Sequence, residues 1–380
     1  MEILHYWQIS DERISNPISG AENHLMVLLP ALSKKGVNVT LLAGCHYIGI
    51  KTSAILEKLE SEGVNIEIIR LPEILKRHNK IEKKLRVLYS YYKITKAFKK
   101  HNNKIFHLHL NLFHFPLVAK MVGSKKIVCS VHADLPAYNN RYYKKWFNIL
   151  AKKGVQFIAI TDHVRNHMIE KAGLPPTAIQ TIHYGVPLPV SPIQPHTRNE
   201  INCPQDKFLI GFIGRLTSQK NINVLLTALA AINNDNIHLA IIGEGPLKED
   251  LLNTVQNLGI SKQVNFVGYV DNAVNLMTVF DVFCLPSDWE GLGLVLIEAM
   301  FQRVPIIGST GGAIPEILQG GKYGMLFNAG DPFQLQKCIF EIFNDRHKAK
   351  IIANDAFDYA TENFKVEVMA MKTIKIYERL

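Results

Sequence analysis

Residues 288–298 read Asp288-Trp-Glu-Gly-Leu-Gly-Leu-Val-Leu-Ile-Glu298, and they indicate the architecture of the second half of this chain. The apolar run Val282 to Leu285 comes just before it and predicts a strand, and the apolar residues from Gly293 onward predict a helix. A strand that runs through a glycine loop into a helix is the repeating unit of a parallel α/β sheet. Ligands of such sheets bind beside the carboxyl ends of the strands, where Glu290 falls, while Glu298 lies in the helix.

A second stretch, Gly211 to Asn221 (GFIGRLTSQKN), has the same form of apolar strand, glycine turn and helix start. Arg215 and Lys220 place two cations at this turn. The helix dipole disfavours positive charge at a helix start unless an anion is bound there. Arginine can hold a diphosphate in a fork and lysine acts as a point charge, so the pair indicates a phosphate site. The backbone amides of Gly291 to Gly293 also suit a phosphate, because the N–H groups at a helix start have no partner within the helix.

Strand and helix patterns alternate along the whole chain, which predicts parallel sheets covered on both faces. In the first half we expect strands at residues 2–9, 37–43, 65–71, 105–110, 126–131, 156–160 and 179–183. In the second half we expect them at 208–213, 237–242, 264–267, 282–285 and 305–307. The proline-rich segment 187–206 interrupts the pattern. From Pro332 onward the pattern is helical, and the last helix is amphipathic through Val368, Met371, Ile374 and Tyr377.

Length and composition are those of a folded protein with two cores. The chain has 380 residues, 47% of them hydrophobic, and a formal net charge of +10. The start shows no secretory signal pattern, and no apolar run is long enough for a membrane helix. Five scattered cysteines predict neither a disulfide framework nor a zinc site and favour a reduced, cytoplasmic location.

These motifs resemble those of retaining glycosyltransferases of the GT-B fold, family 4. Two glutamates seven residues apart, Glu290 and Glu298, match the central motif of the family. Further similar segments follow in order: GRLTSQKN at 214–221, IIGEGP at 241–246, VNFVGYV at 264–270, GGAIPEI at 311–317 and YGMLF at 323–327. The first half is similar through SGAENH at 19–24 and SVHAD at 130–134.

The resemblance implies two Rossmann-like, doubly wound α/β domains that face each other across a cleft. It implies an acceptor-binding domain at 1–186, a linker at 187–206 and a nucleotide-sugar domain at 207–363. The remaining residues, 364–380, would form a helix that packs back on the first domain.

The resemblance also implies roles for individual residues. Arg215 and Lys220 would hold the donor diphosphate, with Gly20 and the amides of Gly291, Leu292 and Gly293 beside it. Glu298 would bind the ribose, and Val267, Gly268 and Tyr269 would border the base. As catalytic residues, Glu290 would lie near the transferred sugar and its phosphate, and His132 would contact the sugar or the acceptor. No cofactor or metal would be needed. The donor would be a UDP- or GDP-linked sugar and the acceptor a glycan or a lipid-linked glycan.

The histidines of the first half give a weaker signal. His132 ends a predicted strand and is expected to face the cleft, whereas His24, His107 and His109 are expected to pack or to form hydrogen bonds. No ligand spacing recurs among them, so we expect no metal site.

Basic residues concentrate in one region. Between Arg70 and Lys104 there are twelve lysines or arginines against Glu73 and Glu82, an excess equal to that of the whole chain. Residues 76–104 and 141–147 also interleave aromatic and basic residues. This pattern is consistent either with a solvated helix face or with a surface that binds the anionic inner leaflet of a membrane.

Three other functions can be compared with this one. A nicotinamide dehydrogenase would need Gly-x-Gly-x-x-Gly, but Lys248 stands where the third glycine belongs after Gly243 and Gly245. Nucleic-acid binding would rest on charge alone, since no binding module is visible. A nucleotide-sugar epimerase of the same two-domain architecture remains an alternative.

Overall fold

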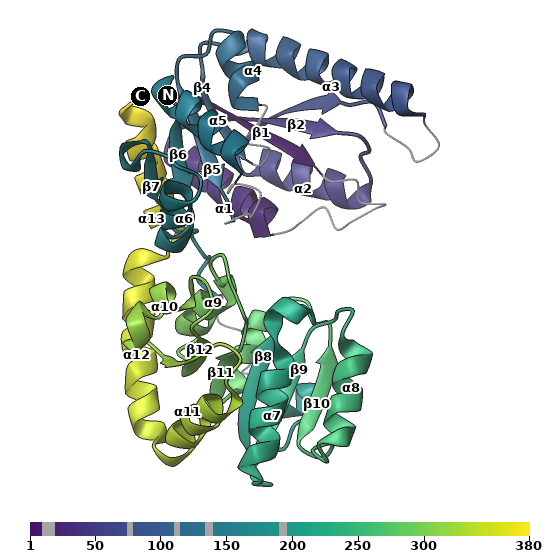
Figure 1. Cartoon of the computed structure of the whole chain (residues 1–380), viewed down its shortest axis with the longest axis vertical. Coiled ribbons are helices and arrows are strands. Elements are labelled where there is room, and N and C mark those ends of the chain that lie inside the picture. Colours follow the sequence, from purple (N-terminus) through teal and green to yellow (C-terminus); the bar gives the residue numbers. More distant parts are fainter. Residues whose placement is uncertain (10–19, 74–78, 110–114, 134–139, 190–195) are drawn as a thin grey trace. The chain divides into compact units, whose positions relative to one another are not determined.

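The computed structural model describes residues 1–380 except 10–19, 74–78, 110–114, 134–139 and 190–195. The chain divides into two compact units (Figure 1). The first contains Met1–Gly185 together with Val366–Leu380, and the second contains Val186–Lys365. The end of the chain is therefore part of the first unit.

The first unit is built on a parallel sheet of seven strands in the order β3-β2-β1-β4-β5-β6-β7. The strands are β1 (Glu2–Ile9), β2 (Asn38–Cys45), β3 (Asn65–Arg70), β4 (Ile105–His109), β5 (Ile127–Val131), β6 (Gln156–Ala159) and β7 (Ile179–Thr181). The helices are α1 (Gly20–Lys34), α2 (Ile50–Ser61), α3 (Lys80–Lys100), α4 (Phe115–Met121), α5 (Arg141–Lys152), α6 (Asp162–Glu170) and α13 (Val366–Glu378). Their sheet-facing side chains form the buried apolar core of the unit.

The helices of the first unit divide between the two faces of the sheet. The chain moves from β1 outward to β2 and β3, and then returns to β4 and continues to β7. Because parallel crossovers are right-handed, α1 and α2 cover one face and α3 to α6 the other. Figure 1 shows this division for α1 and α2 against α3 and α4. Helix α13 packs against α1.

The second unit is a parallel sheet of six strands in the order β10-β9-β8-β11-β12-β13. The strands are β8 (Phe208–Ile213), β9 (Ile237–Ile242), β10 (Val264–Gly268), β11 (Val282–Leu285), β12 (Ile306–Ser309) and β13 (Met325–Phe327). The helices are α7 (Ile222–Ile232), α8 (Lys248–Asn257), α9 (Leu294–Phe301), α10 (Ile314–Ile317), α11 (Pro332–Asn344) and α12 (Arg346–Asn363). Both units are therefore doubly wound α/β structures, as the sequence predicts.

A 3-10 helix, Ala273–Val279, follows Asp271. One local prediction, the apolar face of the last helix, was wrong in part. In α13 the buried face consists of Met369, Ala370, Thr373, Ile376 and Tyr377, whereas Met371 is exposed. The apolar residues of the last helix form two stripes along it. The stripe that is buried is the one that contacts α1.

Candidate functional site

The carboxyl edge of the second sheet brings the two predicted motifs together. The winding direction reverses between β8 and β11, which are adjacent strands. The segment Gly214 to Asn221 follows β8, and the segment Pro286 to Gly293 follows β11. The loops after two such strands diverge and leave a crevice, which is where open α/β sheets bind ligands.

A buried ion pair joins the two loops. Lys220 Nζ lies 2.5 Å from Glu290 Oε1, and the Ser287 hydroxyl donates to the same oxygen at 2.6 Å. Glu290 is only 7% exposed. Since removing either charge would leave the other buried and unpaired, the pair fixes the carboxylate and the ammonium relative to each other.

Polar contacts on either side hold the same two loops. The Asn221 amide donates to Asp288 Oδ1 at 2.6 Å, and the Gln219 amide donates to the Trp289 carbonyl at 2.9 Å. The backbone N–H of Asp288 donates to the Gln219 carbonyl at 2.9 Å. Lys220 and Glu290 therefore belong to one rigid assembly, although 70 residues separate them in sequence.

Glycines allow the neighbouring loops to approach this assembly. A Cβ atom on Gly312, which has φ +63°, would lie 2.3 Å from the Glu290 carbonyl oxygen. A Cβ atom on Gly243, which has φ +139°, would lie 2.0 Å from the Gly214 carbonyl oxygen. Any side chain would push these backbones apart, so the two glycines maintain the packing of the edge.

Arg215 differs from Lys220 in having no partner. Its side chain is exposed and forms no hydrogen bond or ion pair with any residue that the structure describes. In the other loop, α9 begins after Gly293, which has φ +74° and gives the helix no side-chain cap. An exposed guanidinium and an uncapped helix start together present positive charge and N–H donors to an anion.

Glu298 lies on α9, one turn beyond this helix start. Burial raises the pKa of its carboxyl to about 7. No described side chain binds the carboxyl, so its hydrogen-bonding capacity is available to a ligand.

Tyr269 follows β10 and is exposed, and its hydroxyl donates to Asp271 at 2.8 Å. Gly268 accepts a backbone hydrogen bond from Gly243, which links this loop to the glycine loop after β9.

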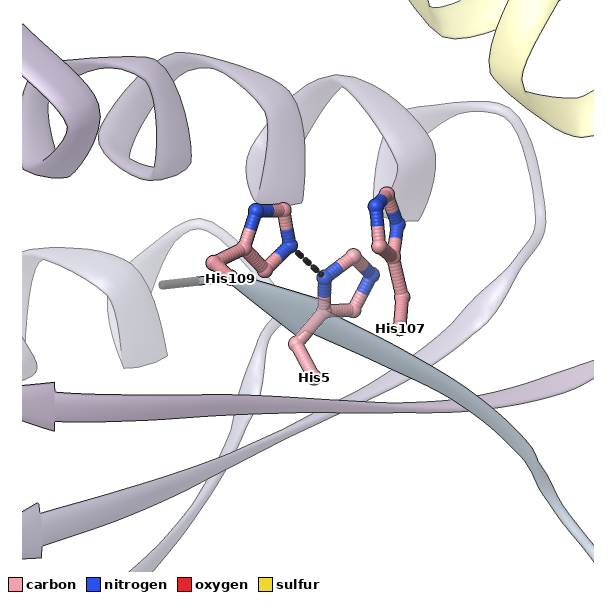
Figure 2. Close-up of side chains that lie close together, drawn as sticks. All are labelled: His5, His107 and His109. Atoms are coloured by element: carbon pink, nitrogen blue, oxygen red, sulfur yellow. Dashed lines mark hydrogen bonds between the residues drawn. The ribbon is translucent and has the colours of Figure 1, made fainter. Parts of the chain in front are cut away.

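The first unit carries a cluster of neutral imidazoles at the middle and carboxyl end of its central strands. His5 on β1 and His107 on β4 are partners in register, and His109 follows two residues later on β4. His5 Nδ1 lies 3.0 Å from His109 Nε2 (Figure 2). His107 binds the Tyr377 hydroxyl of α13 through Nδ1 at 2.5 Å and the Ser130 hydroxyl through Nε2 at 2.8 Å. This network attaches the C-terminal helix to the sheet.

Burial keeps these rings uncharged. It lowers the pKa of His5 to about 3 and the pKa values of His107 and His109 well below their usual range. Each of the three rings offers a nitrogen within 4.8 Å of the others, a spacing that could admit a metal ion. However, hydrogen bonds use both nitrogens of His107, and the group contains no anionic ligand. A divalent ion would keep its full charge in the core, so we interpret the group as a hydrogen-bonded cluster.

His132 lies beside this cluster, just after β5. Its Nδ1 forms a hydrogen bond with the Tyr184 hydroxyl, and His24 stacks on the Tyr184 ring at 4.0 Å. Burial lowers the pKa of His132 to about 4. The other nitrogen, Nε2, is buried and has no hydrogen-bond partner in the part of the chain that the structure describes. Gly20 is the first residue of α1, and the loop before it lies outside the described residues.

Sequence reasoning missed two features of these sites. Ser287 was not singled out, although a hydroxyl three residues before Glu290 can reach its carboxylate. The closeness of His5 to His107 and His109 was also missed. The alternation His-x-His on a central strand was the available signal, but the order of the strands was needed to place His5 beside it.

Comparisons with known proteins agree with this architecture. Residues 194–358 match the family "Glycosyl transferases group 1", and residues 18–189 match "Glycosyltransferase Family 4". N-acetyl-alpha-D-glucosaminyl L-malate synthase of Bacillus anthracis is 26% identical over 75% of this chain and 77% of its own length. HepE of Anabaena, solved with UDP, shares the fold with a TM-score of 0.76, 19% identity and full coverage of both chains.

A relative from Campylobacter jejuni matches a shorter region. It is an alpha-1,4-N-acetyl-D-galactosaminyltransferase acting on an undecaprenol-linked glycan, 35% identical over 39% of this chain and 42% of its own length. The two family matches together extend over nearly the whole chain, and both units have the doubly wound topology of the solved relatives. The chain therefore belongs to the family 4 glycosyltransferases, which have the GT-B fold.

Proposed function

We propose that this enzyme transfers a hexosyl group from a UDP- or GDP-linked sugar to a hydroxyl of a glycan or lipid-linked acceptor, with retention of anomeric configuration. The observation that carries the proposal is the pairing of Lys220 with Glu290 at the switch point of the second sheet. The loop of Lys220 also carries Arg215, which has no partner among the described residues. Structures related by fold have been solved with UDP, and a relative acts on an undecaprenol-linked glycan.

In this mechanism the second unit binds the donor. Arg215 and the amides of Gly291, Leu292 and Gly293 take the diphosphate, and Lys220 adds a second positive charge. Glu298 accepts hydrogen bonds from the ribose hydroxyls, and the main chain of Val267, Gly268 and Tyr269 borders the base. Glu290 orients Lys220 and lies near the transferred sugar. Fixed cations and helix-start amides stabilise the charge that develops on the leaving diphosphate.

The chemical step needs no group beyond substrates and protein. The acceptor oxygen forms a bond to the anomeric carbon on the face from which the diphosphate departs. The bond from that carbon to the phosphate oxygen breaks, and the departing phosphate takes the acceptor proton. His132 of the first unit, a neutral ring with one unpartnered nitrogen, contacts a sugar hydroxyl. The role of Gly20 beside the donor phosphates stays a prediction, because the loop before α1 lies outside the described residues.

We further propose that the reaction takes place at the inner face of the cytoplasmic membrane, in cell-surface polysaccharide or lipopolysaccharide synthesis. No helix in the described part of the chain is long and apolar enough to cross a bilayer. Contact with anionic lipid would then involve residues 79–104 and 141–147, while residues 76–78 of the sequence prediction lie outside the described residues.

A panel of nucleotide sugars tested by thermal shift identifies the donor, since a ligand that binds only the folded state raises the melting temperature. The panel is then incubated with glycan and lipid-linked acceptors. Proton NMR of the product reports its anomeric configuration, and EDTA tests independence from metals. A glycosylated acceptor with the configuration of the donor supports the proposal. An isomerised sugar nucleotide would instead support an epimerase, and inversion would overturn the mechanism.

A further inference from the structure

Helix α3 has two apolar faces, and the fold uses only one. Ile94 and Phe98 are buried against the first unit. On the outside the exposed fractions are 70% for Ile81, 60% for Leu85, 64% for Leu88 and 60% for Tyr92. The spacing of four, three and four residues places these side chains on one side of the helix. A surface helix of a soluble protein is polar on its outer side, so this outer apolar stripe needs a partner.

The neighbouring helices extend the surface. Helices α3, α4 and α5 cover the same face of the first sheet, because their crossovers run in one direction. Figure 1 shows α3 and α4 on the side away from α1 and α2. Met121 at the end of α4 is 75% exposed, and Tyr142 on α5 is 63% exposed. We call α3, α4 and α5 together the docking face.

The charge of the docking face is strongly one-sided. Residues 80–152 contain sixteen lysines or arginines against Glu82 and Asp134. Helices α1 and α2, on the opposite face, contain three lysines and three glutamates. The positive charge of the unit is therefore concentrated on one face of its sheet.

We propose that the docking face binds anionic lipid headgroups, with the outer stripe of α3 inserted at the level of the headgroups. Apolar side chains, tyrosines and lysines occur together on helices that lie in a membrane interface, where lysine stems extend the charge toward the phosphates. A nucleic acid would be attracted by the lysines but would leave the apolar stripe exposed to water. The choice of lipid rests on the proposed function, whose acceptor is lipid-linked.

Flotation with vesicles of phosphatidylcholine, with and without phosphatidylglycerol, tests the proposal on the full chain. We expect binding only with phosphatidylglycerol, and weaker binding at high salt because salt screens surface charge. Replacing Ile81, Leu85 and Leu88 together by glutamine should reduce partitioning at least tenfold. Lys80→Glu with Lys84→Glu should do the same. All five side chains are solvent-exposed or project from the helix surface, so folding is preserved.

Matched controls lie on the other parts of the unit. Ile50→Gln with Ile68→Gln removes two exposed apolar side chains, and Lys51→Glu with Lys58→Glu reverses two exposed charges on α2. Both controls should float like the parent protein. A Tyr92→Trp variant should show blue-shifted emission with phosphatidylglycerol vesicles, because insertion moves the ring out of water.

Several outcomes would overturn the proposal. The first two are that the parent protein does not float at low salt, or that it binds double-stranded DNA more tightly than vesicles. The other two are that the control variants lose as much flotation as the variants of α3, or that the variant that lacks the outer apolar stripe floats like the parent. Thermal shift with UDP is measured on the same preparations, and the nucleotide site lies in the other unit. If the parent protein binds UDP but does not float with phosphatidylglycerol vesicles, the docking face alone is refuted. If the parent protein does not bind UDP, the proposed function is refuted.

Discussion

Both units are doubly wound parallel sheets, yet the side chains at their central strands differ in charge. In the second unit the edge next to β8 and β11 holds the ion pair of Lys220 and Glu290 together with the exposed Arg215. In the first unit the corresponding strands β1 and β4 hold buried, uncharged imidazoles from His5, His107 and His109. A doubly wound sheet thus provides the place for a site, and the side chains at its edge decide whether charge or neutral polar groups are found there.

In the proposed function the two units have different tasks. Neutralising a diphosphate requires cations, and Arg215 and Lys220 of the second unit would supply them. Binding an uncharged sugar hydroxyl requires groups that donate and accept hydrogen bonds without attracting anions, and neutral imidazole has both capacities. The following predictions test this contrast, beginning with the largest effect.

The strongest test is to remove the cation that pairs with Glu290 in the second unit. Lys220→Met should lower turnover about 10²–10³-fold, because a fixed positive charge no longer meets the leaving diphosphate. It should also destabilise the second unit by about 3 kcal/mol, since the buried Glu290 carboxylate loses its partner. Steady-state kinetics and denaturant unfolding measure the two effects.

A double variant separates the two contributions. Lys220→Met combined with Glu290→Gln removes both charges and should regain most of the stability but none of the activity. If the double variant recovers turnover along with stability, the lysine is structural and the contrast between the units is lost.

Acid should destabilise the first unit. The unfolded imidazoles take up protons below about pH 6.5, whereas burial lowers the pKa of His5 to about 3 and that of His132 to about 4. The contribution of these neutral rings to the free energy of unfolding is therefore fully present above pH 6.5. As the pH falls below 6.5, the free energy of unfolding decreases by up to about 1.4 kcal/mol per pH unit for each ring. Denaturant unfolding followed by Trp7 fluorescence should show this loss, and His5→Leu should reduce its slope.

The second unit should show a pH dependence of opposite sign. The folded pKa of Glu298 is raised to about 7, so its folded form gains stability as pH falls from 7 toward the unfolded pKa. Trp289, the tryptophan of the second unit, reports on this unfolding. Parallel losses of Trp7 and Trp289 signals in acid would contradict the distinction between the units.

Arg215→Ala should weaken donor binding about 10–100-fold, since a charge-assisted hydrogen bond contributes about 1.5–3 kcal/mol. It should leave stability unchanged, because Arg215 has no partner among the described residues. Calorimetric titration with UDP and thermal unfolding give both values, and Lys262→Ala, at an exposed lysine after α8, serves as the control. Equal affinities for the parent and the Arg215 variant would remove this residue from the site.

The smallest expected effect concerns Glu298. Ribose hydroxyls donate hydrogen bonds to the carboxylate form, so nucleotide affinity should fall as pH decreases below about 7, by at most about tenfold per pH unit. Titrations in buffers of different ionisation enthalpy should detect proton release on binding near pH 7. Glu298→Gln should bind more weakly and lose the pH dependence. A parent protein whose affinity is flat between pH 6 and 8 would rule out this role.

The bounds of several strands could be predicted closely from the sequence, because local residue patterns mark them. β8 and β11 have the predicted bounds, because each is an apolar run of strand length that ends at a glycine or a proline. The buried face of α13 could not be predicted, since two apolar stripes were available and the partner helix α1 lies more than 300 residues away in sequence. Likewise Ser287 becomes part of the site only through the conformation of its loop.

The parallel α/β class, the two loops that carry Arg215, Lys220 and Glu290, and the helix that carries Glu298 could be predicted from the sequence, because they depend on local periodicity and on residue types. Which distant residues meet depends on the tertiary structure. Lys220 reaches Glu290 only because β8 and β11 are neighbours, and His107 reaches Tyr377 only because the last helix returns to the first unit. Pairing of this kind depends on strand order and on helix docking, which are properties of the whole chain and leave no periodic signal along it.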